Sequence, residues 1–210
     1  MMIPEIKICG VTNVEDALAA LAMGADYLGF VMYAKSPRGI SAERLRSVRD
    51  ALPDEARCIA VFVNESREVV LRVAEECRLY AVQIHGDEST DDFRAMPLPV
   101  WRALAVSAQG TKPLPVEWPA DRYVIDAPAP GRYGGSGELA DWDAAAELAA
   151  RCPVMLAGGL TPENVVAALQ AVKPLGVDVA SGVEATPGIK DHAKLAAFFE
   201  RCRGAMEKTE

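Results

Sequence analysis

Histidine, paired cysteines and basic charge are all scarce in this sequence of 210 residues. Only two histidines occur, and the five cysteines include no C-x-x-C spacing, so neither a histidine cluster nor a zinc-ligand pattern is available. An odd number of widely spaced cysteines also argues against a disulfide framework. We therefore expect no metal site, and a chain whose thiols stay reduced in the cytoplasm.

Basic residues are outnumbered, since 22 Lys and Arg stand against 30 Asp and Glu, a formal net charge of −8. Proteins that bind the nucleic-acid backbone carry a basic face, so we expect no nucleic-acid partner. A small anion could still bind at a local site. Half of the residues are apolar, enough for a sizeable core, and no linker or shift in composition divides the chain. The sequence predicts one domain over residues 1–210.

Apolar runs long enough to cross a membrane are also lacking. The nearest candidate, Ala17–Ala34, has 18 residues with Asp26 as its only charge, but Gly24 interrupts it. Its second half, Tyr27–Met32, is rich in strand formers, so we interpret the segment as a helix, a turn and a buried strand. The first ten residues lack a basic region followed by an apolar one, so we expect no signal peptide and no membrane partner.

Short apolar runs recur along the whole chain. Their starts lie 20 to 31 residues apart, which leaves room for a helix between neighbours. Helix start signals occupy most of the gaps, namely Asn13, Ser41, Ser66, Thr161-Pro162 and Asp191. Eight strands alternating with seven or eight helices indicate parallel βα units. The predicted strands are Ile6–Cys9, Tyr27–Met32, Cys58–Val63, Tyr80–His85, Val100–Val106, Tyr123–Asp126, Val154–Ala157 and Gly176–Ala180.

An open doubly wound sheet and a closed barrel both show this alternation. Eight units favour a single (β/α)8 TIM barrel, and 210 residues is near the small end of that class. Pro113, Pro115 and Pro119 lie in the fifth crossover, where they argue against a regular helix. We therefore expect an α/β TIM barrel with an irregular fifth crossover.

Polar side chains interrupt several predicted strands near their carboxyl ends. In a barrel, alternate residues face the interior, and the chemistry lies at the carboxyl ends of the strands. A buried polar group without partners costs about 1–3 kcal/mol, so a purely structural barrel would hold aliphatic residues there. The alternative is a set of internal ion pairs, such as Lys7 with Asp178. The polar residues are Lys7, Cys9, Gln83, His85, Arg102, Asp126 and Asp178.

Cys9 and Asp126 are the candidate catalytic pair. A lone cysteine is usually a core residue, but Cys9 ends a strand on the same face as Lys7, and a nearby cation lowers a thiol pKa. Asp126 ends another strand, where it could instead cap a loop. A thiolate and a carboxylic acid at strand ends of one barrel would supply a general base and a general acid.

Two glycine loops and one arginine are candidate anion sites. Gly158-Gly159 follows the seventh strand and Ser181-Gly182 follows the eighth, the two places where barrels commonly hold phosphate. Arg38, after the second strand, could bind a carboxylate through two parallel contacts or could be an ordinary surface arginine. The glycine-rich stretch 134–137 could be a lid or a long turn.

These segments together resemble the phosphoribosylanthranilate isomerase family, and they occur in the family's order. One departure is Ser136, where threonine is expected; the hydroxyl is retained. The matching segments are Lys7–Thr12 (KICGVT), Ser36–Arg38 (SPR), Val82–Gly86 (VQIHG), Asp126 with 134–137 (GGSG), Leu156–Leu160 (LAGGL), Asp178–Glu184 (DVASGVE) and Pro187–Asp191 (PGIKD).

The resemblance implies an Amadori rearrangement, the third step from chorismate in tryptophan biosynthesis. It implies a phosphorylated aminosugar, N-(5-phosphoribosyl)anthranilate, as substrate, and no cofactor. By the same resemblance Asp126 is the acid and Cys9 the base, and Arg38 pairs with the anthranilate carboxylate. The remaining implied substrate-binding residues are Gly158, Gly159, Ser181 and Gly182 for the phosphate, with Asp178, Gln83 and His85 beside them. A monomer is the expected state, with a homodimer as the alternative.

Three other functions stay open at this point. The histidine-pathway isomerase runs the same chemistry on a similar barrel, but its family is expected to carry Asp where this chain has Cys9. Indoleglycerol-phosphate synthase is expected to need a catalytic lysine pair and a longer N-terminus. A non-catalytic sugar-phosphate sensor would keep the glycine loops but would have no need for both Cys9 and Asp126.

Overall fold

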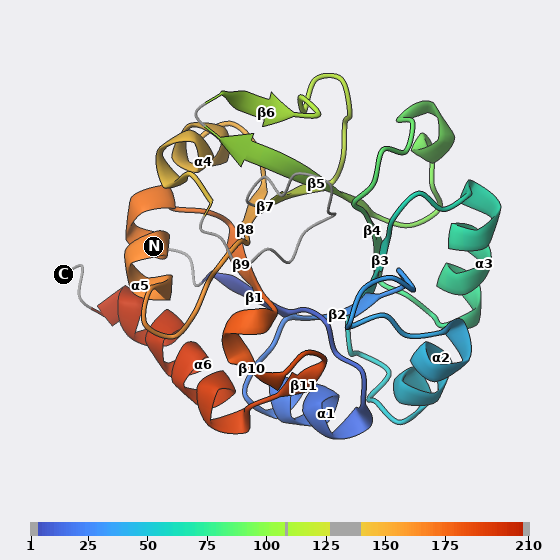
Figure 1. Ribbon diagram of the computed structural model, residues 1–210, viewed down its shortest axis with the longest axis horizontal. Helices are drawn as coiled ribbons and strands as arrows, with labels where there is room; N and C mark the ends of the chain where they lie inside the picture. The colour runs from blue at the N-terminus through green and yellow to red at the C-terminus, as the bar shows by residue number, and fades with distance from the viewer. Residues whose placement is uncertain (1–3, 108, 127–139, 208–210) are drawn as a thin grey trace.

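Eight parallel strands form a closed barrel surrounded by helices in the computed structural model, which describes residues 4–107, 109–126 and 140–207 (Figure 1). Neighbouring strands follow the order β4-β3-β2-β1-β9-β8-β7-β5, and pairing of β4 with β5 closes the ring. The prediction of a TIM barrel is therefore confirmed. The barrel strands are β1 Glu5–Ile8, β2 Tyr27–Val31, β3 Cys58–Phe62, β4 Ala81–Ile84, β5 Val100–Ser107, β7 Arg122–Asp126, β8 Val154–Leu156 and β9 Gly176–Val179.

Six α-helices lie in the described part of the chain, fewer than the seven or eight expected. Side chains at several helix starts accept hydrogen bonds from backbone N–H groups that have no partner within the helix. Asn13, Ser41 and Ser66 do this for α1, α2 and α3, and Asp191 does it for α6. The helices are α1 Val14–Ala22, α2 Ala42–Asp50, α3 Arg67–Glu76, α4 Trp142–Ala149, α5 Val165–Val172 and α6 His192–Glu207.

One of the predicted helix starts is displaced. Thr161-Pro162 was expected to open a helix directly, but α5 begins at Val165. The Thr161 hydroxyl and backbone instead form a turn, in which the Thr161 Oγ1 accepts from the Glu163 N–H and the Asn164 side chain accepts from the Thr161 N–H. These local hydrogen bonds offer the backbone an alternative to the first helical turn.

Two consecutive crossovers carry no α-helix in their described residues. After β4 there is only a single turn of 3-10 helix, η1 Asp91–Phe93, where a full helix was predicted. After β5 the chain forms β6 Gly110–Lys112, antiparallel to the end of β5, and then the turns that contain the three prolines. Trp118 and Phe93, stacked at 6.3 Å, fill part of the space that helices cover elsewhere.

Alternation along the strands separates two apolar clusters. One lies between the strands and the helices, and the other fills the barrel interior with Tyr27, Ile59, Trp101, Val124 and Met155 among its members. At the amino-terminal end of the barrel a half-buried Glu5–Arg122 ion pair and the Tyr27 and Trp101 rings pack together. The interior is thus filled at one end, which leaves the carboxyl end of the strands for a pocket.

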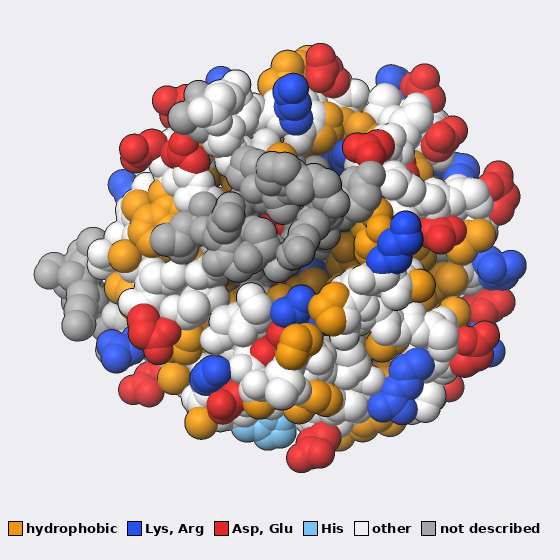
Figure 2. Space-filling view, viewed as in Figure 1, with side chains coloured by type: hydrophobic (Ala, Val, Ile, Leu, Met, Phe, Trp, Pro, Cys, Tyr) orange, Lys and Arg blue, Asp and Glu red, His pale blue; other side chains and the backbone are white. Residues whose placement is uncertain are grey.

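The surface and the helices have two further properties. No helix among the described residues is both long enough and apolar enough to cross a membrane. On the face shown in Figure 2, Lys and Arg side chains lie singly among acidic ones rather than gathering into a basic patch.

Candidate functional site

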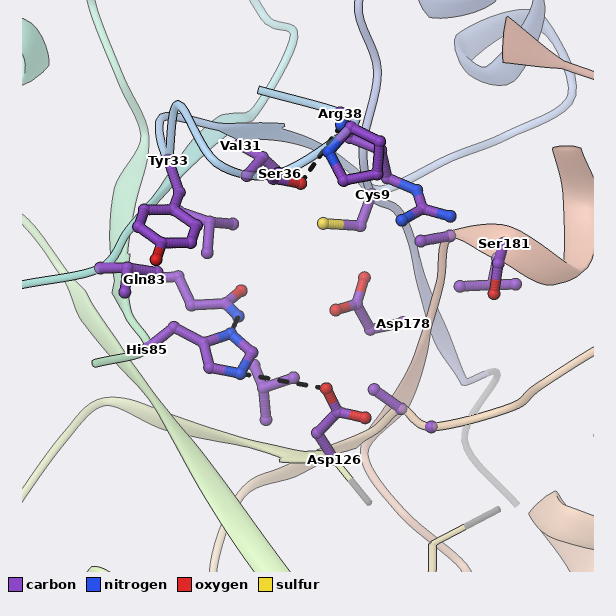
Figure 3. Close-up of a pocket in the computed structure, with 18 of the residues that line it drawn as sticks. Cys9, Val31, Tyr33, Ser36, Arg38, Gln83, His85, Asp126, Asp178 and Ser181 are labelled. Atoms are coloured by element: carbon purple, nitrogen blue, oxygen red, sulfur yellow. Dashed lines mark hydrogen bonds and ion pairs between the residues drawn. The ribbon is translucent and has the colours of Figure 1, made fainter. Parts of the chain in front are cut away.

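A pocket of about 590 Å³ opens at the carboxyl ends of the barrel strands. It is lined by side chains from β2, β3, β4, β7 and β9 and from the segments that follow β1, β2, β3, β4, β8 and β9, several of which the close-up in Figure 3 labels. The sequence-predicted residues on its wall are Cys9, Arg38, Gln83, His85, Asp126, Gly158, Gly159, Asp178 and Ser181.

Cys9 and Asp126 project into this pocket from opposite sides (Figure 3). Cys9 follows the last residue of β1, and its N–H donates to the Val179 carbonyl at 2.8 Å. Asp126 is the last residue of β7. Both positions are set by the pleat, because inward-facing residues alternate and each strand ends at the same rim.

Lys7 lies behind Cys9 and is fully buried. Its Nζ donates to the Asp178 Oδ2 at 2.9 Å, so the internal ion pair considered as the structural alternative is present. Burial alone would lower the Lys7 pKa, but the charges of Asp178 and Cys9 outweigh it and raise the pKa. Lys7 therefore stays charged beside the thiol.

Burial raises the pKa of the Cys9 thiol above its ordinary value, although Lys7 and Lys190 act to lower it. The Asp178 carboxylate adds to the increase. Lys7 does act to lower this pKa, as expected, but the net shift is upward because burial outweighs it. Desolvation and the Asp178 charge together penalise the thiolate more than the two nearby cations favour it.

His85 faces Asp126, with its Nε2 3.9 Å from the Asp126 Oδ2, and Gln83 lies on its other side. Burial and the charges of Arg102 and Lys7 lower the His85 pKa to about 4, so the ring is neutral near pH 7. Gln83 Nε2 lies 3.5 Å from His85 Nδ1, which leaves Nε2 as the ring nitrogen facing the acid. Asp126 thus has a neutral neighbour at the pH where an acid must hold its proton.

Two buried acceptors in the pocket lack hydrogen-bond partners among the described residues. They are the Asp178 Oδ1 and the Gln83 Oε1. Leaving a buried polar atom unpaired is costly, and such atoms are satisfied when a ligand donates to them. The pair therefore points to a ligand with hydroxyl groups.

The two glycine loops after β8 and β9 pack directly on each other. Gly158 and Gly159 have φ of 82° and 60°, a conformation that favours glycine. Gly182 does not line the pocket, but a Cβ there would lie 1.8 Å from the Leu160 carbonyl oxygen. Ser181 opens a short 3-10 helix, η2 Ser181–Val183, on the pocket wall. Exposed backbone N–H groups in such loops are suited to an anion.

Arg38 reaches the pocket from the loop after β2, and its side chain lies against Gly10. Its Nε and Nη2 donate to Glu184, with Nη2 2.7 Å from Oε2. Gly10 has φ of 72°, and a Cβ there would lie 2.6 Å from the Arg38 Cδ, so glycine is required for this approach.

Sequence reasoning missed some parts of the site and misplaced one residue. Arg102 faces outward from the barrel, donating to the Ile84 and Gly86 carbonyls and lying over the Trp118 ring, because Trp101 takes the inward position of β5. Glu184 and Lys190 were not singled out, although their place in the motifs after the last strand was a usable signal. The stretch 134–137 lies outside the described residues.

No group of three or more His, Cys, Asp or Glu side chains in the described ranges is placed to hold a metal ion. What the pocket offers is a thiol opposite a carboxyl, unpaired acceptors for hydroxyls, and backbone and arginine groups for anions. The fold and the pocket together define a (β/α)8-barrel enzyme that acts on a small anionic molecule by acid–base chemistry.

Comparison with known proteins identifies the family. The sequence profile of N-(5'-phosphoribosyl)anthranilate (PRA) isomerase matches residues 6–201. The N-(5'-phosphoribosyl)anthranilate isomerase of Geotalea uraniireducens (strain Rf4) is 43% identical over 200 residues, covering 95% of this chain and 98% of the relative. This chain belongs to the N-(5'-phosphoribosyl)anthranilate isomerase family, the isomerases of tryptophan biosynthesis, as its sequence motifs predicted.

Solved structures agree with this assignment. The phosphoribosyl anthranilate isomerase of Thermotoga maritima superposes with a TM-score of 0.85 at 41% identity, covering 96% of this chain and 99% of that one. Another isomerase structure, in complex with reduced 1-(o-carboxyphenylamino)-1-deoxyribulose 5-phosphate, superposes with a TM-score of 0.80 at 36% identity, covering 96% and 99%.

Proposed function

We propose that this chain converts N-(5-phosphoribosyl)anthranilate into 1-(2-carboxyphenylamino)-1-deoxyribulose 5-phosphate, with Asp126 as general acid and Cys9 as general base. The observation that carries the assignment of roles is the placement of these two groups on opposite sides of one pocket. Acid and base on opposite sides can act on neighbouring atoms of one sugar without neutralising each other.

The acid step opens the ribose ring. Asp126 gives its proton to the ring oxygen as the bond from C1 to that oxygen breaks, and the nitrogen lone pair forms an iminium. The neutral His85, 3.9 Å from the carboxyl, adds no positive charge that would favour early loss of the proton. Asp126 ends the step as a carboxylate.

The base step removes the proton from C2. The Cys9 thiolate takes this proton, the electron pair of the C–H bond forms the C1–C2 double bond, and the iminium nitrogen regains its lone pair. The resulting enolamine tautomerises to the ketone, so the net reaction is an isomerisation. Because burial raises the Cys9 pKa, its thiolate is scarce at neutral pH but strongly basic when formed.

The two ends of the substrate each carry an anionic group that the pocket would bind. The phosphate would lie on the backbone of Gly158, Gly159 and the Ser181–Gly182 turn, where glycine allows close approach. The carboxylate would pair with Arg38. The unpaired Asp178 Oδ1 and Gln83 Oε1 would accept from the sugar hydroxyls.

Turnover of purified protein with two aminosugar phosphates tests this function. We expect loss of N-(5-phosphoribosyl)anthranilate and no turnover of the histidine-pathway aminosugar. Turnover of the latter alone would contradict the proposal in favour of the histidine-pathway isomerase. Binding of ribose 5-phosphate without turnover of either compound would favour a sugar-phosphate sensor.

Two finer points belong to the same proposal. We infer that residues 1–210 act as one domain and that the protein works as a monomer, since acid, base and both anion sites come from one chain. We also propose that it works in the cytoplasm, where its five widely spaced cysteines would stay reduced. Size-exclusion chromatography with light scattering at assay concentration should give one chain's mass, 22.5 kDa. Twice that mass would show a dimer.

A further inference from the structure

One edge of the Arg38 guanidinium, formed by Nε and Nη2, pairs with a carboxylate that is distant in the sequence. Glu184 lies 146 residues from Arg38 and accepts from both Nε and Nη2. The Glu184 side chain is 4% exposed and that of Arg38 is 13% exposed, so the pair lies at the pocket wall with only the arginine reaching the opening. Within the described chain, Nη1 takes part in none of these hydrogen bonds, so one edge of the guanidinium stays available.

Glu184 is in turn anchored by Lys190, whose side chain is fully buried. Lys190 Nζ donates to the Glu184 Oε1 at 3.0 Å, to the Cys9 carbonyl at 2.6 Å and to the Ala180 carbonyl at 3.3 Å. An ammonium has three donors, and all three are used. Lys190 therefore ties Glu184 to the end of β1, which carries the base, and to the end of β9, which precedes the Ser181 turn.

With Arg38 and Lys190 both protonated, the Arg38–Glu184–Lys190 cluster carries one net positive charge, because two cations share a single carboxylate. Burial lowers the Lys190 pKa below its ordinary value, and the charge of Glu184 opposes this shift. Burial alone would raise the Glu184 pKa, but hydrogen bonding from Arg38 and the charge of Lys190 lower it, so the carboxylate stays ionised. A buried site with one unbalanced positive charge is completed by a ligand that brings one negative charge. The substrate carboxylate of the proposed function is such a group.

We propose that Glu184, anchored by Lys190, is the positioning residue for substrate-carboxylate binding: it fixes Arg38 so that the free guanidinium edge meets the carboxylate. This inference rests on the proposed function, in which Arg38 pairs with the carboxylate of N-(5-phosphoribosyl)anthranilate. A bidentate contact on one side of a guanidinium limits its rotation and so lowers the entropy lost when the other side binds.

Glu184→Gln tests this role, since it keeps size and one acceptor but removes the charge. We expect KM for the substrate to rise about tenfold while kcat changes less than about threefold, the pattern for lost binding rather than lost chemistry. Inhibition by ribose 5-phosphate, which has no carboxylate, should change less than about twofold. That inhibitor also shows that the pocket is folded. An unchanged KM for the substrate would overturn the proposal.

Glu5→Gln is the matched control. Glu5 pairs with Arg122 and accepts from the Tyr27 hydroxyl, but at the amino-terminal end of the barrel. This variant removes an arginine–carboxylate pair without touching the pocket, so both KM and kcat should stay at their original values. An equal rise in KM in both variants would show a general loss of packing and would overturn the proposal.

A double-mutant cycle separates the positioning role from the proposed function. Arg38→Ala should raise KM, and adding Glu184→Gln to it should change KM by less than about twofold, because Glu184 acts through Arg38. If Glu184→Gln has the same effect with and without Arg38, the positioning role is overturned while the carboxylate pairing stands. If Arg38→Ala leaves KM unchanged, the pairing itself fails, although turnover of the original chain would still support the isomerase.

Discussion

Lys7 and Asp178 form a buried ion pair, 2.9 Å from Nζ to Oδ2, and both charges act on the Cys9 thiol. The pair places a cation and an anion near the same sulfur, so their effects on the thiol pKa oppose each other. Burial then decides the direction, and the pKa of Cys9 lies above its ordinary value. In the proposed mechanism, Cys9 is therefore a base whose raised pKa keeps most of it protonated at neutral pH and makes its thiolate strongly basic.

The first prediction concerns the ionisation of Cys9. Alkylation by iodoacetamide follows the thiolate, so its rate at Cys9 should rise with pH and reach its midpoint above the ordinary thiol pKa of about 8.5. Mass spectrometry of the Cys9 peptide measures this rate separately from other cysteines. A midpoint below the ordinary value would show that Lys7 outweighs burial, contrary to the structure.

The pH dependence of kcat/KM should be bell-shaped and should match that midpoint. The reactive form needs thiolate on Cys9 and a proton on Asp126, although a carboxylic acid ordinarily loses its proton well below a thiol. When the acid has the lower pKa, the reactive form is a minor species at every pH. Its population falls above the Cys9 pKa, because no more thiolate can form there while the protonated fraction of the acid keeps decreasing. The pKa of the alkaline limb should therefore equal the midpoint pH of Cys9 alkylation. If the alkaline pKa of kcat/KM and the alkylation midpoint differ clearly, this protonation scheme is refuted.

Asp126→Asn should lower kcat by roughly 10²–10⁴, because an amide of the same shape cannot donate the proton that opens the ring. The pocket should stay intact, as measured by direct binding of ribose 5-phosphate to the variant and to the original chain. The neighbouring His85 is no substitute, since its pKa of about 4 leaves it uncharged in the neutral range. Turnover within a few-fold of the original would remove Asp126 from the acid role.

His85 should make the fold sensitive to acid. Its pKa is about 4 when folded and 6.5 in the unfolded reference, so the unfolded chain binds the extra proton between these values. Stability should therefore fall as pH drops from about 6.5 to about 4, by up to about 3 kcal/mol from this group. Urea unfolding of the original chain and of His85→Asn at several pH values measures the difference. Parallel curves for the two proteins would contradict the burial of a neutral ring.

Two glycine substitutions should act in opposite directions. Gly182→Ala would place a methyl group 1.8 Å from the Leu160 carbonyl oxygen, so the loops after β8 and β9 must separate. We expect a loss of about 1–3 kcal/mol in stability and weaker inhibition by ribose 5-phosphate. Gly204→Ala is the control, since Gly204 lies in α6 with nothing within 4 Å of the added Cβ. It should gain about 0.5–1 kcal/mol and leave inhibition unchanged. A tolerated Gly182→Ala would show that the two loops do not meet as described.

The sequence pattern was sufficient for the barrel and for much of the pocket, for identifiable reasons. Apolar runs mark buried strands, and the i, i+2 spacing of Lys7 with Cys9 and of Gln83 with His85 fixes which face they share. Arg102 could not be placed this way, because a single polar residue in a strand does not reveal which parity faces inward.

Other features needed the three-dimensional structure. The fourth crossover carries acidic and small residues that are compatible with a helix, yet it forms only η1. The direction of the Cys9 pKa depends on desolvation, which local sequence does not report. The Arg38–Glu184 pair joins residues 146 apart, so only the closed barrel brings them together.

The most direct measurement compares turnover of N-(5-phosphoribosyl)anthranilate by the original chain and by Cys9→Ala. Direct binding of ribose 5-phosphate to both proteins is the control for an intact pocket, and inhibition of the original chain by ribose 5-phosphate shows that this probe occupies the active pocket. If Cys9 removes the C2 proton, the original chain consumes the substrate and the variant is slower by orders of magnitude, while both bind the phosphate probe equally. Near-normal turnover by Cys9→Ala would contradict the account at its centre, because no base would then be assigned to the step that makes the ketone.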